Sequence, residues 1–118
     1  MRLLTIVFSL ASLLCLGCMA ERGEDVIEAI RTFGEDGRIF YVHFRNVIGT
    51  VPQYTEVFPN IGTTDMPAAL RALYEVGYDQ FLVPDHHFGI TYDTDWGSAS
   101  RSWQVGYLTA LLQTTAPS

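Results

Sequence analysis

The sequence predicts an α/β fold in which short parallel strands alternate with helices, and three observations support this prediction. Apolar segments typical of strands and of helices follow one another in the order strand, helix, strand, helix, strand, helix. The predicted strands are nearly continuous apolar runs, as in sheets that are buried on both faces. Three such units leave parallel edges uncovered, so we expect the 118 residues to be a segment of a larger barrel, because a whole (β/α)8 barrel needs about 250 residues.

The first apolar run has two interpretations. Arg2 precedes a mostly apolar stretch over residues 3–16, and small residues follow up to Ala20, which is typical of a secretory signal peptide. In the other interpretation, residues 12–16 form a buried strand, and periodicity alone does not separate the two. The run is shorter than a helix that spans a membrane.

The next two predicted elements are a helix over residues 24–35 and a strand over residues 38–44. Apolar side chains at helical spacing, including Ile30 and Phe33, predict the helix, and Gly34 and Gly37 favour its end. A β-branched and aromatic run predicts the strand. Residues 46–64 follow as a long loop, and loops of this length in compact domains are often functional.

The remaining elements complete the alternation. Asp65 suits the N-cap of a helix over residues 65–76, and a strand over residues 81–83 follows. The polar residues 84–87 come directly after this strand. Another loop, over residues 88–99, leads to a final helix over residues 100–113.

Charge and cysteine usage exclude some classes of protein. The net charge is −6, and all seven basic residues are scattered arginines, whereas a nucleic-acid-binding protein usually has a basic stripe. The chain contains two cysteines, Cys15 and Cys18, which are too close together to form a disulfide framework. We therefore expect no nucleic-acid partner, and no membrane partner.

Three residues that can ligate metals stand at the carboxyl ends of the three predicted strands. They are Cys15, His43 and Asp85, and strand ends in parallel sheets meet at one edge. Together a thiolate, an imidazole and a carboxylate can bind Mn²⁺, Fe²⁺ or Zn²⁺. Each residue also has a structural interpretation: Cys15 as an inert buried thiol, His43 as a hydrogen-bonded core histidine, and Asp85 as the cap of a turn.

Further polar residues flank these positions. His86 and His87 follow Asp85, and this clustering after a buried strand indicates a site. Arg45 and Asn46 could bind a carboxylate, the arginine through its two-pronged guanidinium, or they could hydrate the start of a loop.

Several ordered motifs resemble the mannonate dehydratase family. They cover most of residues 14–113 and are the following: Leu14-Cys15-Leu16-Gly17-Cys18, Tyr41-Val42-His43-Phe44-Arg45-Asn46, Glu56-Val57-Phe58, Pro84-Asp85-His86 and Thr94-Asp95-Trp96-Gly97. The resemblance implies the C-terminal segment, about three βα units, of a TIM-like (β/α)8 barrel of the xylose-isomerase-like type. It implies a metal-dependent hydro-lyase that uses Mn²⁺ or Fe²⁺ to convert D-mannonate into 2-dehydro-3-deoxy-D-gluconate in glucuronate catabolism.

The resemblance also implies roles for individual residues. Cys15, His43 and Asp85 correspond to metal ligands, His86 corresponds to the catalytic acid/base, and Arg45 and Asn46 correspond to positions near the substrate. A thiolate ligand must stay reduced, which favours the cytoplasm over an exported protein.

The chain also departs from the family. Residues 1–11 resemble nothing in it, so that residues 12–118 are the expected barrel segment, and the family's upstream histidine ligand is missing. We expect the chain alone to be inactive, and the full-length enzyme could form oligomers. The alternatives are an inactive truncated remnant, a small exported protein cut after Ala20, and another sugar-metabolising metal enzyme on the same barrel.

Overall fold

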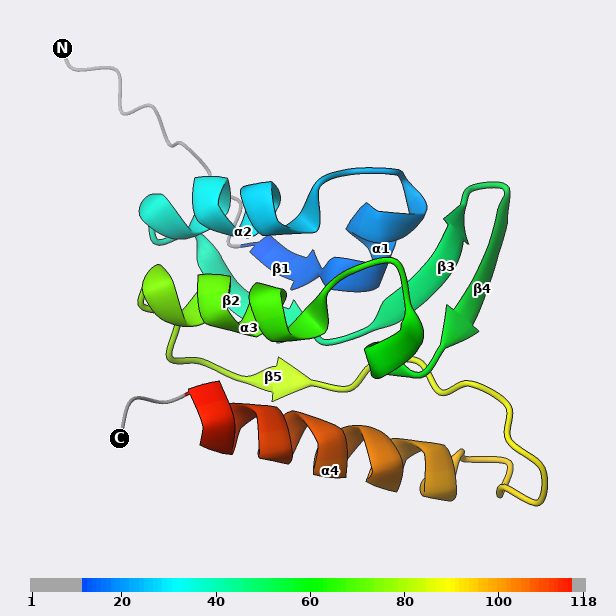
Figure 1. Cartoon of the computed structure of the whole chain (residues 1–118). Coiled ribbons are helices and arrows are strands. Elements are labelled where there is room, and N and C mark those ends of the chain that lie inside the picture. The colour runs from blue at the N-terminus through cyan, green and yellow to red at the C-terminus, as the bar shows by residue number, and fades with distance from the viewer. Residues whose placement is uncertain (1–11, 116–118) are drawn as a thin grey trace, which may run out of the picture.

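The computed structural model describes residues 12–115 and confirms the predicted parallel α/β arrangement. Strands β1 (Ser12–Cys15), β2 (Ile39–His43) and β5 (Leu82–Val83) form a parallel sheet in the order β1-β2-β5 (Figure 1). The register pairs Cys15 with His43, and His43 with Val83, so the carboxyl ends of the three strands lie side by side. The predicted unmatched segment, residues 1–11, lies outside the described residues.

Three helices pack along this sheet. They are α2 (Val26–Glu35), α3 (Met66–Glu75) and α4 (Ser98–Thr115), and α3 packs against both others (Figure 1). Asp65 caps α3 as predicted, because its Oδ1 accepts a hydrogen bond of 2.9 Å from Ala68 N. Among residues 12–115, no helix is both long and apolar enough to span a membrane.

The hydrophobic core lies between the sheet and these helices. Helix α3 buries Met66, Leu70 and Leu73, which recur at helical spacing on one face. Val42 of β2 and Ile30 of α2 are each 0% exposed. The helices therefore pack on the sheet, and the segments that follow the strands lie at its carboxyl edge.

The prediction of a long loop over residues 46–64 is wrong. Residues Asn46–Thr50 and Gln53–Val57 form an antiparallel hairpin of strands β3 and β4, and a short 3₁₀ helix, η1 (Pro59–Ile61), follows. Strand β4 has no buried residue, so its sequence lacks the apolar alternation that would identify it. Gly49 adopts a φ of 87° within β3, where a side chain would be strained. The glycine and Pro52 suggested a loop, yet they belong to the hairpin.

A short helix between β1 and α2 was also missed. Strand β1 ends at Cys15, one residue before the predicted end, and helix α1 (Leu16–Glu21) begins at once. Cys15 is its N-cap, and its Sγ accepts a hydrogen bond of 3.4 Å from Cys18 N. The apolar run continues from the strand into this helix, so that hydrophobic periodicity could not locate the boundary. Helix α4 begins at Ser98 and ends at Thr115, two residues beyond its predicted range at each end.

Candidate functional site

Cys15, His43 and Asp85 come together at the carboxyl edge of the sheet. One donor atom from each, a sulfur, a ring nitrogen and a carboxylate oxygen, lies within 4.8 Å of the other two. His43 Nδ1 lies 3.1 Å from Asp85 Oδ2. The three side chains are partly buried, and they come from β1, β2 and the segment after β5. The donor set and its spacing fit a single divalent cation, because thiolate, imidazole and carboxylate all ligate such ions.

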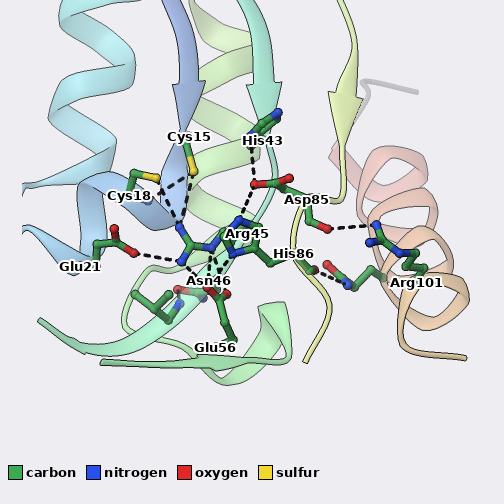
Figure 2. Close-up of polar contacts among 12 residues, drawn as sticks. Cys15, Cys18, Glu21, His43, Arg45, Asn46, Glu56, Asp85, His86 and Arg101 are labelled. Atoms are coloured by element: carbon green, nitrogen blue, oxygen red, sulfur yellow. Dashed lines mark hydrogen bonds and ion pairs between the residues drawn. The ribbon is translucent and has the colours of Figure 1, made fainter. Parts of the chain in front are cut away.

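His86 lies next to this group and contacts two carboxylates. Its Nδ1 lies 2.9 Å from Glu56 Oε1, and its Nε2 lies 3.3 Å from Asp85 Oδ2 (Figure 2). The His86 side chain is 52% exposed, so a small molecule can reach it. Glu56 comes from β4, the strand whose existence the sequence did not predict.

Arg45 is the centre of a buried polar network beneath the site. Its side chain is only 2% exposed and forms ion pairs with Glu56 and Glu21 (Figure 2). Arg45 Nε donates to both Glu56 oxygens at 2.8 and 2.9 Å, and Nη2 donates to Glu21 Oε2 at 2.9 Å. The remaining nitrogen, Nη1, lies 3.7 Å from Cys15 Sγ and 3.4 Å from Cys18 Sγ. One guanidinium therefore links β1, α1 and β4.

Gly17 makes room for this arginine. A Cβ atom at position 17 would lie 2.6 Å from Arg45 Cγ, which is closer than atoms can approach. The glycine of the Cys-x-Gly motif therefore has a packing role, since it lets the arginine side chain lie against helix α1.

The network shifts the pKa values of its members. Burial alone would raise the pKa of Glu56, but hydrogen bonds with Arg45 and His86 bring that pKa below its usual range. For the cationic Arg45, burial acts to lower the pKa, but the hydrogen bonds with Glu56, Cys15 and Glu21 raise this pKa above its usual value. Burial and the neighbouring Cys15 thiol raise the pKa of Cys18 to about 11. Glu56 and Arg45 are thus a charged pair at neutral pH.

Asn46 has a different environment from that expected of a substrate-binding residue. It is 1% exposed, and its Nδ2 donates to the carbonyls of Pro59 and Thr64, both at 2.8 Å. Its Oδ1 accepts from Val47 N at 3.0 Å and from Thr64 N at 3.1 Å. Asn46 therefore holds the segment after β4 against β3, and its contact with a substrate stays a prediction.

Helix α4 supports the turn that contains Asp85 and His86. Arg101 Nη1 donates to the Asp85 carbonyl at 3.2 Å (Figure 2). Gln104 Nε2 donates to the His86 carbonyl at 3.0 Å. Gln104 is 3% exposed. The helix thus fixes the main chain of the turn and leaves the two side chains free to face the site.

The sequence predicted the three clustered residues and His86, but it did not reveal the residues that hold these side chains and their backbone in place. Glu56 was noticed only as part of a motif, although an acidic residue in a β-forming segment could have marked it as a partner for Arg45. Glu21 and Gln104 gave no signal, because polar residues in helices are usually solvated. The spacing Cys15-x-x-Cys18 was visible in the sequence and is a recognised signal for paired thiols.

Comparison with known protein families gives one extensive match. A family model described as D-mannonate dehydratase (UxuA) matches residues 2–116. The matched range starts within residues 1–11, for which the motifs gave no resemblance. The division of the chain near residue 11 stays a prediction.

Individual relatives give the same result. A mannonate dehydratase from Thermotoga neapolitana is 34% identical over 92 residues, which are 75% of this chain and 24% of that protein. Mannonate dehydratase 2 from Halalkalibacterium halodurans is 35% identical over 92 residues, which are 25% of its length. The chain thus spans about a quarter of the length of the curated relatives that it matches.

A solved structure supports the fold. The crystal structure of mannonate dehydratase from Streptococcus suis serotype 2 matches with a TM-score of 0.80 and 24% sequence identity. The match covers 87% of this chain and 32% of that one. The chain therefore has the fold of about a third of that protein, which confirms the predicted fold class.

Proposed function

Because the chain belongs to the mannonate dehydratase family, as the match over residues 2–116 shows, we propose that its site serves the dehydration of D-mannonate to 2-dehydro-3-deoxy-D-gluconate. The observation that supports this proposal most directly is the meeting of Cys15, His43 and Asp85, whose donor atoms lie within 4.8 Å of one another. These residues would hold Mn²⁺ or Fe²⁺. When bound, such a cation stabilises the negative charge that develops on the substrate carboxylate as the neighbouring proton is removed.

In this proposal His86 moves the proton. Glu56 lies 2.9 Å from Nδ1 and is ionised, so it accepts a hydrogen bond from that nitrogen and fixes the tautomer of the ring. Nε2, which lies 3.3 Å from Asp85 Oδ2, would take the proton next to the carboxylate or donate one to the departing hydroxyl, since an imidazole can act as a general acid or base. The 52% exposure of His86 leaves this nitrogen accessible to a sugar acid.

The contacts of Arg45 favour a positioning role over direct contact with the substrate. All three of its nitrogens have partners, and its side chain is 2% exposed. We propose that Arg45 orients Glu56 and thereby His86. We also propose a cytoplasmic location, because the Cys15 thiol must stay reduced to bind a cation.

Cation binding by the chain is the first test. We expect Mn²⁺ to bind one site per chain in isothermal titration calorimetry, and we expect His43→Ala to weaken this binding at least about tenfold, because one of three ligands is lost. His87→Ala is the matched control, since His87 lies outside the ligand group. Equal binding by wild type and His43→Ala would refute the assignment of the site.

The reaction itself is tested separately. The Mn²⁺-loaded chain is incubated with D-mannonate, and 2-keto acid formation is followed, with His86→Asn as the comparison. Product formation that His86→Asn abolishes supports the proposal. Product formation that is equal in both contradicts the proposed role of His86. A loaded chain that forms no product agrees with the expectation that this part of the barrel is inactive alone, and the same comparison is then made in a chain completed with the missing units of a homologous mannonate dehydratase, where an unchanged rate in His86→Asn would contradict the proposal.

A further inference from the structure

Cys15 and Cys18 form a pair of neighbouring thiols at the edge of the site. They stand three residues apart at the start of α1, so that their side chains lie on the same side of the turn. Both sulfur atoms lie next to one nitrogen, Arg45 Nη1, at 3.7 and 3.4 Å (Figure 2). A hydrogen bond from Cys18 N to Cys15 Sγ, 3.4 Å long, holds the two residues together. The two thiols therefore lie beside the same guanidinium nitrogen at the start of α1.

Reagents in solution can reach this pair. Cys18 is exposed and Cys15 is partly exposed. Both cysteines line a cavity of about 480 Å³, together with residues that include Leu13, Met19 and Phe33. Its size is sufficient for a small organic disulfide to approach the thiols.

We propose that Cys15 and Cys18 form a reversible disulfide with each other, and that this bond withdraws Cys15 from the cation site. The oxidant is a low-molecular-weight disulfide of the glutathione type. Cys15 attacks one of its sulfurs, which forms a mixed disulfide and releases one small thiol that takes up the Cys15 proton. Cys18 then attacks the Cys15 sulfur, so that the second small thiol leaves with the Cys18 proton. Two electrons pass from the protein thiols to the small disulfide.

The Cys15 sulfur cannot be a cation ligand and part of the disulfide at the same time. A sulfur that is bonded to Cys18 is no longer a thiolate, and only the thiolate ligates metals. Oxidation therefore leaves His43 and Asp85 as a pair of ligands, and a bound cation in turn shields Cys15 from oxidation. This coupling rests on the proposed cation site, whereas formation of the disulfide does not.

The test uses the intact 118-residue chain. The reduced chain is incubated with oxidised glutathione, alkylated with iodoacetamide, digested with trypsin and analysed by mass spectrometry. Trypsin cuts after Arg2 and Arg22, so both cysteines fall in one peptide. We expect this peptide to lose two hydrogen atoms, to retain no glutathione and to accept no alkyl group. In Cys18→Ser we expect glutathione to remain attached to Cys15, because no second thiol can release it.

The coupling is measured on the same samples. We expect Mn²⁺ to slow disulfide formation in wild type but not in His43→Ala, and we expect the oxidised chain to bind Mn²⁺ at least about tenfold more weakly. Circular dichroism spectra of all variants ensure that the folded forms are compared.

The outcomes are distinguishable. Glutathione retained on wild type, disulfide-linked dimers, or two alkylated cysteines after oxidation would overturn the disulfide. A disulfide that forms while Mn²⁺ binding stays unchanged would overturn the coupling. If the reduced chain does not bind Mn²⁺ at all, the cation site of the proposed function fails, and the coupling fails with it.

Discussion

Replacement of Glu56 by glutamine should destabilise the protein far more than loss of one surface charge does. The Glu56 side chain is 25% exposed and its partner Arg45 is 2% exposed, so the variant leaves a buried guanidinium with Glu21 as its one carboxylate partner. Removing one partner of a buried ion pair costs about 3–5 kcal/mol. Because Glu21 remains and glutamine keeps one acceptor, we expect a loss below that range, about 2–3 kcal/mol.

The assay is urea denaturation followed by circular dichroism and tryptophan fluorescence. Glu24→Gln is the matched control, because the Arg22–Glu24 pair is 3.4 Å apart and its side chains are 71% and 44% exposed. Such exposed pairs contribute about 0–1 kcal/mol. A Glu56→Gln variant as stable as Glu24→Gln would refute the view that Arg45 depends on Glu56 for its charge compensation.

Three further predictions concern stability. Asn46→Ala should lower the free energy of unfolding by about 3 kcal/mol or more, because several backbone groups lose their hydrogen-bond partner. A loss below about 1 kcal/mol in urea denaturation would contradict the view that Asn46 holds the segment after β4 in place. Gly17→Ala should lower the melting temperature, although alanine favours helices, because its Cβ would clash with Arg45; a rise would contradict the packing described. Desolvation acts to raise the pKa of Asp93, but the hydrogen bonds that it accepts, among them those from the first amides of α4, together lower this pKa from 3.8 to about 2. Its stabilisation should therefore be complete above about pH 4 and lost as the pH falls toward about 2, and Asp93→Asn should show a smaller change in stability over that interval in acid titrations followed by circular dichroism.

The helices and the parallel strands could be predicted from the sequence, because the signals for each of these elements lie within a short segment of the chain. Helix α3 has an aspartate N-cap and apolar residues at helical spacing, and both signals act over a single turn. Cys15, His43 and Asp85 could be grouped because each follows an apolar strand, and parallel strands end at one edge.

The features that were missed depend on contacts distant in sequence. Strand β4 is mostly exposed, and its pairing with β3 rather than its own burial pattern makes it a strand. Glu56 reaches Arg45, eleven residues away, and His86, thirty residues away, only after the hairpin has formed. The hydrogen bonds of Asn46 could not be predicted for the same reason, since its four hydrogen-bonding contacts include residues 59 and 64, on the far side of the hairpin.

Helix α4 binds the turn at Asp85 and His86 through carbonyl oxygens, and not through the two side chains. Every amino acid has this carbonyl, so the path of the turn does not depend on which side chains occupy positions 85 and 86. Substitutions at positions 85 and 86 can therefore place new side chains at the same edge of the sheet while the backbone of the turn keeps its path. A library randomised at these two positions should retain the fold of the parent while it samples new donor sets for cations and new groups for proton transfer.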